Sequence, residues 1–297
     1  MRWAVTVRWE RTAKPTAVVA QISRATRAAT RRRSRLELAR VSDLFLPPAP
    51  HGPLTLWCAL ELRPGGTPRI KLYLNPGARG AERSLETVGE AMARLGHGGA
   101  FEPLLRYLRP RFPERAGLMF FALDVGPWPR PRAKVYVVHH HATAADAAEA
   151  ARLVPAASPR KVAEHCRRIG GDGPFDRLPL ISCYAFTHDD DGGSEGVGKG
   201  DRRGEDRGPT GHTIHVPVRA CVRDDRMARD HAVRLLRRHG VCGAPLDRAL
   251  AALTVRPLDA GVGLISCLSL VHADRQAPRI TVYLSSEAYR VFPPRTD

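Results

Sequence analysis

Three segments of the chain repeat a basic residue, a lysine or threonine, and a tyrosine at alternate positions. The members are Arg69, Lys71 and Tyr73; Arg132, Lys134 and Tyr136; and Arg279, Thr281 and Tyr283. Residues two apart on a β-strand share a face, so each segment would present these side chains together. Basic groups stabilise a departing diphosphate through charge-assisted hydrogen bonds, and aromatic faces attract a carbocation. The pattern therefore indicates chemistry in which a diphosphate leaves and a cation is shielded.

A fourth segment carries Thr213 and His215 at the matching positions. Aligned on Tyr73, Tyr136, His215 and Tyr283, the four segments are spaced by 63, 79 and 68 residues. The alternative interpretation is a set of strands whose basic residues face solvent. Repetition at the same strand position, without a comparable acidic face to pair with it, favours the functional interpretation.

Each segment is expected to be the second strand of a β-hairpin, because an apolar first strand and a turn or polar loop precede it. The predicted pairs are residues 56–62 with 69–74, 118–125 with 132–138, 180–186 with 212–218, and 264–270 with 279–284. Helical periodicity predicts helices at residues 16–39, 85–95, 101–108, 143–154, 158–169, 225–239 and 245–253. Repeated ββαα units of this kind predict an α+β fold, a closed antiparallel barrel with surrounding helices, since closure removes exposed sheet edges.

The basic composition of the chain does not by itself identify a binding partner. The net charge is +17, and only five of the 47 basic residues are lysines. This arginine bias can reflect a GC-rich genome as readily as an anionic partner, and the only dense basic run is Arg31–Arg33. No apolar run approaches the roughly 20 residues of a membrane helix, and the six cysteines form no C-x-x-C pair. We expect a cytoplasmic protein with reduced thiols, no metal, no nucleic-acid partner and no membrane partner.

The repeated strands, together with the run from Asp43 to Pro48, resemble the dimethylallyltryptophan synthase family of aromatic prenyltransferases, over about residues 36–294. The resemblance implies the ABBA-type antiparallel barrel. It implies dimethylallyl diphosphate as donor and an indole, tryptophan or a tryptophan derivative, as acceptor. It also implies a metal-independent Friedel–Crafts alkylation that uses no cofactor.

The same resemblance assigns roles to individual residues. Diphosphate binding would fall to Lys71, Arg132, Lys134, His215 and Arg279, and cation shielding to Tyr73, Tyr136 and Tyr283. His215 departs from the pattern, because the family commonly has tyrosine there. A histidine can still bind a phosphate oxygen, but it shields a cation less well.

A second departure concerns the first repeat. Family members have five strand pairs and four can be found here. The missing pair is the first, which in the family carries a glutamate that takes the indole N–H proton and an arginine that grips the diphosphate. Residues 1–35 match no family segment, so we expect an arginine-rich N-terminal segment of uncertain structure, then a prenyltransferase domain over 36–297 with a mobile loop at about 189–209. Glu61 and Asp124 are candidates for a replacement base, or they are ordinary strand-end acids.

Two further motifs are assigned no function. The tracts His139–His141 and Asp189–Asp191 lack the spacing of metal ligands, so no metal site is expected. Two rival interpretations remain. One is a truncated or catalytically degenerate family member that binds a ligand or partner chain, and the other is a basic nucleic-acid-binding protein. As an enzyme, the chain would be a monomer or a homodimer.

Overall fold

The computed structural model describes residues 3–9, 32–52, 56–62, 65–67, 69–125, 128, 131–188, 208–273, 276–287 and 290–296, with the backbone alone for residues 3–9 and 32–36. The predicted mobile loop at about 189–209 and the Asp189–Asp191 tract lie outside these residues, apart from the end of the loop at 208–209. The chain divides into two compact units. Unit 1 comprises Met1–Val137 and Tyr184–Thr210, and unit 2 comprises Val138–Cys183 and Gly211–Asp297.

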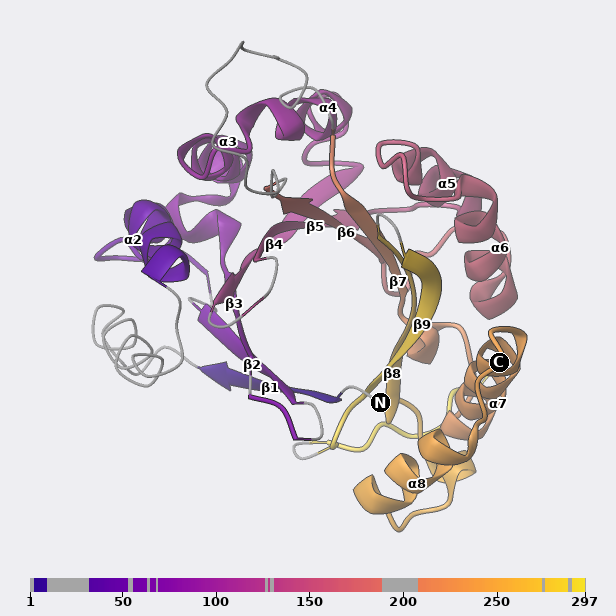
Figure 1. Cartoon of the computed structure of the whole chain (residues 1–297). Coiled ribbons are helices and arrows are strands. Elements are labelled where there is room, and N and C mark those ends of the chain that lie inside the picture. The colour runs from indigo at the N-terminus through magenta and orange to yellow at the C-terminus, as the bar shows by residue number, and fades with distance from the viewer. Residues whose placement is uncertain are drawn as a thin grey trace. The chain divides into compact units, whose positions relative to one another are not determined.

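Within the described residues, nine strands are hydrogen-bonded in chain order, from β1 to β9 (Figure 1). Their bounds are β1 Trp3–Trp9, β2 Leu56–Leu62, β3 Arg69–Leu74, β4 Ala116–Val125, β5 Arg132–His139, β6 Leu180–Thr187, β7 Gly211–Val216, β8 Ile265–Ala273 and β9 Gln276–Leu284. The helices are α2 Arg32–Phe45, α3 Ser84–Arg94, α4 Gly98–Leu108, α5 Ala144–Ala151, α6 Pro159–Gly170, α7 Asp225–Arg238 and α8 Ala244–Leu253. None of these described helices is long and apolar enough to cross a membrane.

The four predicted hairpins are confirmed, and β2 and β3 have the predicted bounds. Strand β7 ends at Val216 because Pro217 has no N–H group to continue the ladder. Strand β1 was not predicted; it pairs antiparallel with β2, before the first predicted hairpin. Of the helix predicted at 16–39, residues 16–31 lie outside the described part of the chain, and the observed helix α2 continues to Phe45.

Unit 1 buries the apolar face of its strands beneath helices α2, α3 and α4 (Figure 1). Leu72 and Leu74 of β3 and Phe121 of β4 are almost completely buried. Phe45 of α2 stacks on Phe121, with ring centroids 4.9 Å apart. Helix α2 therefore continues past the predicted end because its last turn supplies a core side chain. The opposite face of the same strands is left to the polar residues between these apolar ones.

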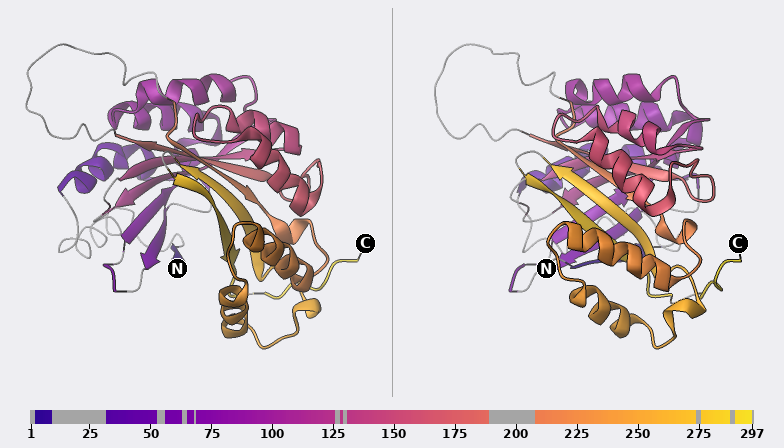
Figure 2. Two further views of the ribbon diagram at one scale, coloured as in Figure 1. Left: turned by 45° about the vertical axis from the view of Figure 1, so that its right-hand side comes forward. Right: turned by 90° about the vertical axis from the view of Figure 1, so that its right-hand side faces the viewer.

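Unit 2 has its own core beneath helices α5 to α8 (Figure 2). Helix α6 begins as its sequence predicts, with the Ser158 side chain accepting from the Lys161 N–H group and proline in the first turn. Burial raises the pKa of the Cys166 thiol to about 12, and those of Cys221 and Cys267 to about 11.

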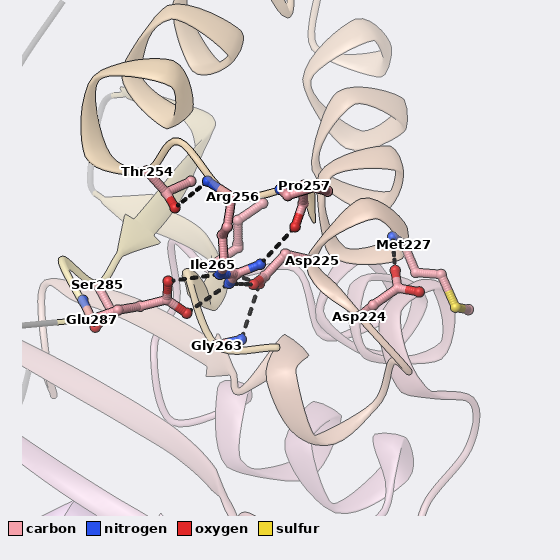
Figure 3. Close-up of polar contacts among 10 residues, drawn as sticks. All are labelled: Asp224, Asp225, Met227, Thr254, Arg256, Pro257, Gly263, Ile265, Ser285 and Glu287. Atoms are coloured by element: carbon pink, nitrogen blue, oxygen red, sulfur yellow. Dashed lines mark hydrogen bonds and ion pairs between the residues drawn. The ribbon is translucent and has the colours of Figure 1, made fainter. Parts of the chain in front are cut away.

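A buried ionic network joins the start of α7 to the segments on either side of the last hairpin (Figure 3). The Asp225 carboxylate accepts from the N–H groups of Gly263 and Ile265 at 3.0 and 3.2 Å, and from Arg256 Nη2 at 2.5 Å. Arg256 also donates to both carboxylate oxygens of Glu287, at 3.0 and 2.7 Å. Glu287 has a φ of 52°, a conformation that costs a non-glycine residue about 1–2 kcal/mol. The bidentate contact offsets that cost and fixes this segment against α7.

Five histidines lie buried in unit 2: His139, His165, His212, His215 and His272. His165 Nε2 lies 3.2 Å from the Leu268 carbonyl oxygen, and His212 Nε2 lies 3.1 Å from Ser182 Oγ. Burial lowers the pKa of His165 to about 4 and that of His212 to about 3. The folded unit therefore holds these two side chains neutral, and protonation opposes folding.

Replacing Arg256 with methionine should lower the free energy of unfolding by about 3–5 kcal/mol, because two buried carboxylates lose their counter-charge. Arg226→Met is the matched control: its ion pair with Asp259 is exposed, so its loss should cost about 1 kcal/mol or less. Urea unfolding of both variants measures the difference. Equal costs would show that the network in Figure 3 adds nothing beyond a surface ion pair.

The free energy of unfolding should fall as the pH drops below about 6.5. In this range the histidines of the unfolded chain bind protons, whereas His165 and His212 of the folded chain stay neutral. The loss should continue toward pH 4, at up to about 1.4 kcal/mol per pH unit for each histidine. In urea unfolding between pH 7.5 and 4.5, His212→Gln should reduce this slope. His51→Gln, at an exposed position, should leave it unchanged, and an unaltered slope in His212→Gln would contradict the assignment.

Candidate functional site

Strands β2 to β5 of unit 1 present one polar face, which we call the basic–aromatic face. It consists of Trp57, Glu61, Arg69, Lys71, Tyr73, Phe120, Asp124, Arg132, Lys134 and Tyr136. The strand register places Lys71 opposite Asp124 and Tyr73 opposite Trp57. The intervening residues point to the helix side, where Leu72 is 1% exposed. Alternation along the strands thus separates the chemistry from the core.

Two ion-pair groups organise the charges of this face. Lys71 Nζ lies 3.2 Å from Glu61 Oε2. Asp124 is 2% exposed, with Oδ2 2.6 Å from Arg132 Nε and Oδ1 3.7 Å from Lys134 Nζ. Within the face, four basic side chains meet two carboxylates, so a net positive charge remains for an anion.

The expectation that no acidic face pairs with the basic residues is therefore wrong. Glu61 and Asp124 both come from the first strand of a hairpin, and the basic partners of each lie on a neighbouring strand. A carboxylate opposite or diagonal to a basic residue across a strand pair is within reach of its side chain. The two proposed bases are the counter-ions of the predicted diphosphate site.

Next to the charges lies a cluster of aromatic rings. Phe120 is at its centre, with ring centroids 4.7 Å from Trp57, 5.7 Å from Tyr73 and 6.0 Å from Tyr136. Tyr73 and Tyr136 are 5.7 Å apart. The two predicted shielding tyrosines of unit 1 are thus brought together. Phe120 and Trp57 join them, and sequence reasoning missed both because they lie on first strands, outside the repeated motif.

Trp128 is a further residue that the sequence did not suggest. It lies in the β4–β5 connection, 4% exposed, and its Nε1–H group donates to the Ile70 carbonyl oxygen at 3.0 Å. The charged ends of Arg69, Lys71 and Arg132 lie 5.2, 5.1 and 5.3 Å from its ring centroids. Cation–π contacts at such distances contribute roughly 0.5–2 kcal/mol each.

The other three predicted site residues lie in unit 2, on β7 and β9. His215 faces Ser269 across the strand pair, with Nδ1 2.8 Å from the Ser269 hydroxyl oxygen. The Tyr283 ring is 5.4 Å from the His215 ring and 41% exposed. Arg279 Nη1 donates to the Gln276 side chain at 3.2 Å. His215 and Tyr283 are therefore in contact, and Ser269 is a partner that the motif did not reveal.

The histidine tract does not gather into a metal site. His139 is buried in β5, whereas His141 lies in the turn after it and pairs with Asp176 at 2.7 Å. Among the described residues, no group of three or more histidine, cysteine or acidic side chains could hold a metal ion.

Comparison with known proteins identifies the family. The model of the tryptophan dimethylallyltransferase family matches residues 5–169. The structure of PriB in its binary complex with product diphosphate is 44% identical, with a TM-score of 0.80, covering 95% of this chain and 72% of that one. The 5-dimethylallyl tryptophan synthase from Streptomyces coelicolor, in complex with DMASPP and Trp, is 38% identical, with a TM-score of 0.78, covering 100% and 81%.

A more distant match shows the fold alone. AnaPT from Neosartorya fischeri is 14% identical, with a TM-score of 0.66, covering 95% of this chain and 70% of that one. These matches confirm the α+β, ABBA-type fold class of the aromatic prenyltransferases. The chain belongs to the tryptophan dimethylallyltransferase family, and it is a prenyltransferase.

The match also corrects the expectation for the N-terminus. Residues 1–35 were expected to resemble no family segment, but the family match begins at residue 5, within β1. The segment Trp3–Trp9 alternates apolar and polar residues only from Val5 to Trp9, and no turn sequence follows it directly to mark it as half of a hairpin. Its pairing partner β2 becomes visible only in the structure.

Proposed function

We propose that this chain transfers the dimethylallyl group of dimethylallyl diphosphate to tryptophan without a metal, and that the basic–aromatic face of unit 1 carries the leaving group and the cation. The observation that carries the proposal is the juxtaposition of net positive charge with a ring cluster on four adjacent strands. The complexes of the related enzymes with diphosphate or with DMASPP and Trp support it. The cytoplasmic location and a monomeric or homodimeric state remain predictions.

The diphosphate is assigned to Lys71, Arg132 and Lys134. A leaving diphosphate carries up to three negative charges, and basic groups held in place before it arrives stabilise that charge without reorganising. Asp124 and Glu61 neutralise part of the positive charge when the site is free. The N–O distances of these ion pairs are 2.6 Å for Arg132 with Asp124 and 3.2 Å for Lys71 with Glu61, within contact range for holding the basic groups in place. The remaining net positive charge favours the diphosphate.

The allylic carbon is assigned to the ring cluster of Tyr73, Phe120 and Tyr136. As the C–O bond breaks, the electron pair leaves with the diphosphate and positive charge develops on the five-carbon group. The faces of these rings attract that charge, and they exclude the water that would trap the cation. A carbon of the indole ring then forms the new C–C bond, and loss of the ring proton restores aromaticity.

The proton acceptor is assigned to Glu61 rather than Asp124. Asp124 contacts two basic groups, Arg132 and Lys134, so accepting a proton would break two ion pairs. Glu61 forms an ion pair with Lys71, and that lysine can turn to the diphosphate as the leaving group departs. Asp124 then holds the diphosphate-binding groups Arg132 and Lys134 in place through its ion pairs.

His215, Arg279 and Tyr283 keep their predicted roles in unit 2. Ser269 fixes the His215 ring through the contact at Nδ1, and the binding of a phosphate oxygen by His215 remains a prediction. The exposed Tyr283 ring next to it would shield the cation.

The purified chain, incubated with dimethylallyl diphosphate, L-tryptophan and EDTA, should yield an adduct enlarged by one five-carbon group, detected by mass spectrometry. Lys134→Ala should lower kcat/KM by about 100-fold or more, as expected when one preorganised charge is removed. Lys161→Ala, an exposed lysine on α6, is the control and should retain full activity. No adduct with tryptophan or other indoles would favour the rival interpretation, a degenerate member that only binds ligands.

Glu61→Gln preserves the shape of the side chain but cannot accept a proton. It should reduce kcat by about 100-fold and remove the acidic limb of the pH–rate profile. Asp124→Asn should instead raise the KM for dimethylallyl diphosphate and keep that limb, because it disturbs Arg132 and Lys134. If the limb disappears in Asp124→Asn and persists in Glu61→Gln, the two roles are exchanged.

A further inference from the structure

We propose that Trp128 is a positioning residue that holds the diphosphate-binding Lys71 and Arg132, together with the neighbouring Arg69, in place while leaving their positive charge available. The inference rests on the proposed function, since it takes Lys71 and Arg132 as ligands of the diphosphate. It adds a residue from the β4–β5 connection, outside the repeated strand motif, to the site.

The Trp128 ring is fixed to the strand that carries two of those side chains. Its Nε1–H group donates to the carbonyl oxygen of Ile70 at 3.0 Å. Ile70 stands between Arg69 and Lys71 in β3, so the hydrogen bond sets the ring directly beside both. The side chain is 4% exposed, which means that packing as well as the hydrogen bond restrains it.

Three cations surround this one indole. Arg69 and Lys71 come from β3, and Arg132 comes from the first position of β5, all at 5.1–5.3 Å from a Trp128 ring centroid. Cations gathered at this density repel one another, so an uncompensated cluster would spread into solvent. The negative face of an aromatic ring attracts each cation without adding a formal charge.

The distinction between the ring and an acid is what gives Trp128 its function. Glu61 and Asp124 hold Lys71 and Arg132 by ion pairs, and every such pair subtracts charge from the site. Arg69 is held by the Trp128 ring through a cation–π contact at 5.2 Å. Another carboxylate at this position would order the same side chains but would compete with the diphosphate. An indole orders them and leaves the net positive charge intact.

Binding of inorganic pyrophosphate by calorimetry tests the inference, with steady-state kinetics as the second readout. Trp128→Leu should bind pyrophosphate about tenfold more weakly than the unmodified chain, because three weak cation contacts are lost. The KM for dimethylallyl diphosphate should rise by a similar factor, while the KM for tryptophan stays within about twofold. Trp128→Phe, which keeps a smaller ring and loses the N–H group, should fall between the two.

Phe45→Leu provides the control for lost packing. It removes a buried aromatic ring that stacks on Phe121, on the helix side of β4 and opposite the basic–aromatic face. It should lower the melting temperature and leave pyrophosphate affinity unchanged. If Trp128→Leu does not fold, Trp128→Phe replaces it, with an expected loss of about threefold.

The outcomes separate the inference from the function on which it rests. Unchanged pyrophosphate affinity in a folded Trp128→Leu variant, alongside weaker binding in Lys134→Ala, would overturn the role of Trp128 alone. Unchanged affinity in both variants would overturn the proposed diphosphate site. A Trp128→Leu variant in which the KM values for both substrates rise equally would show a general structural role instead.

Discussion

Repulsion among basic side chains on the two strands that flank β4 is the constraint that shapes unit 1. Arg69, Lys71, Arg132 and Lys134 belong to β3 and β5, and strand β4 between them carries Asp124. A single buried carboxylate on the middle strand therefore reaches across to Arg132 and Lys134, while Glu61 holds Lys71 from the other side. The helices can pack closely on the opposite face because strand alternation keeps all of this charge on one side.

Unit 2 meets a related problem in another way. His165 and His212 are held neutral by desolvation, so they need no counter-ion. Its buried Arg256 cannot become neutral, and it is compensated by two carboxylates from separate segments. The two units thus accommodate polar groups differently: a retained excess of charge in unit 1, and charge neutralisation beneath the helices of unit 2.

The sequence allowed accurate prediction of the elements and only partial prediction of the site. Alternation and turn residues located eight strands, since these signals are local. The basic residues and tyrosines of the second strands could also be found, because they repeat. Trp128 and the ion-pairing roles of Glu61 and Asp124 could not, because each depends on the register between strands, which no local pattern encodes. Strand β1 was missed for the same reason: its partner lies beyond residues 10–31, for which the pattern gives no hairpin.

Burial lowers the reactivity of three cysteine thiols in unit 2 toward alkylating reagents. Cys166, Cys221 and Cys267 have pKa values of about 11–12 because burial disfavours the thiolate, and the thiolate is the form that reacts with alkylating reagents. At neutral pH their thiolate fraction is therefore small, and they react more slowly than an exposed cysteine of ordinary pKa. Cys242 is exposed and serves as the reference cysteine that reacts first after the reagent is added. The alkylation rates of these native cysteines, relative to that of Cys242, therefore report on the protection of unit 2 without an introduced label.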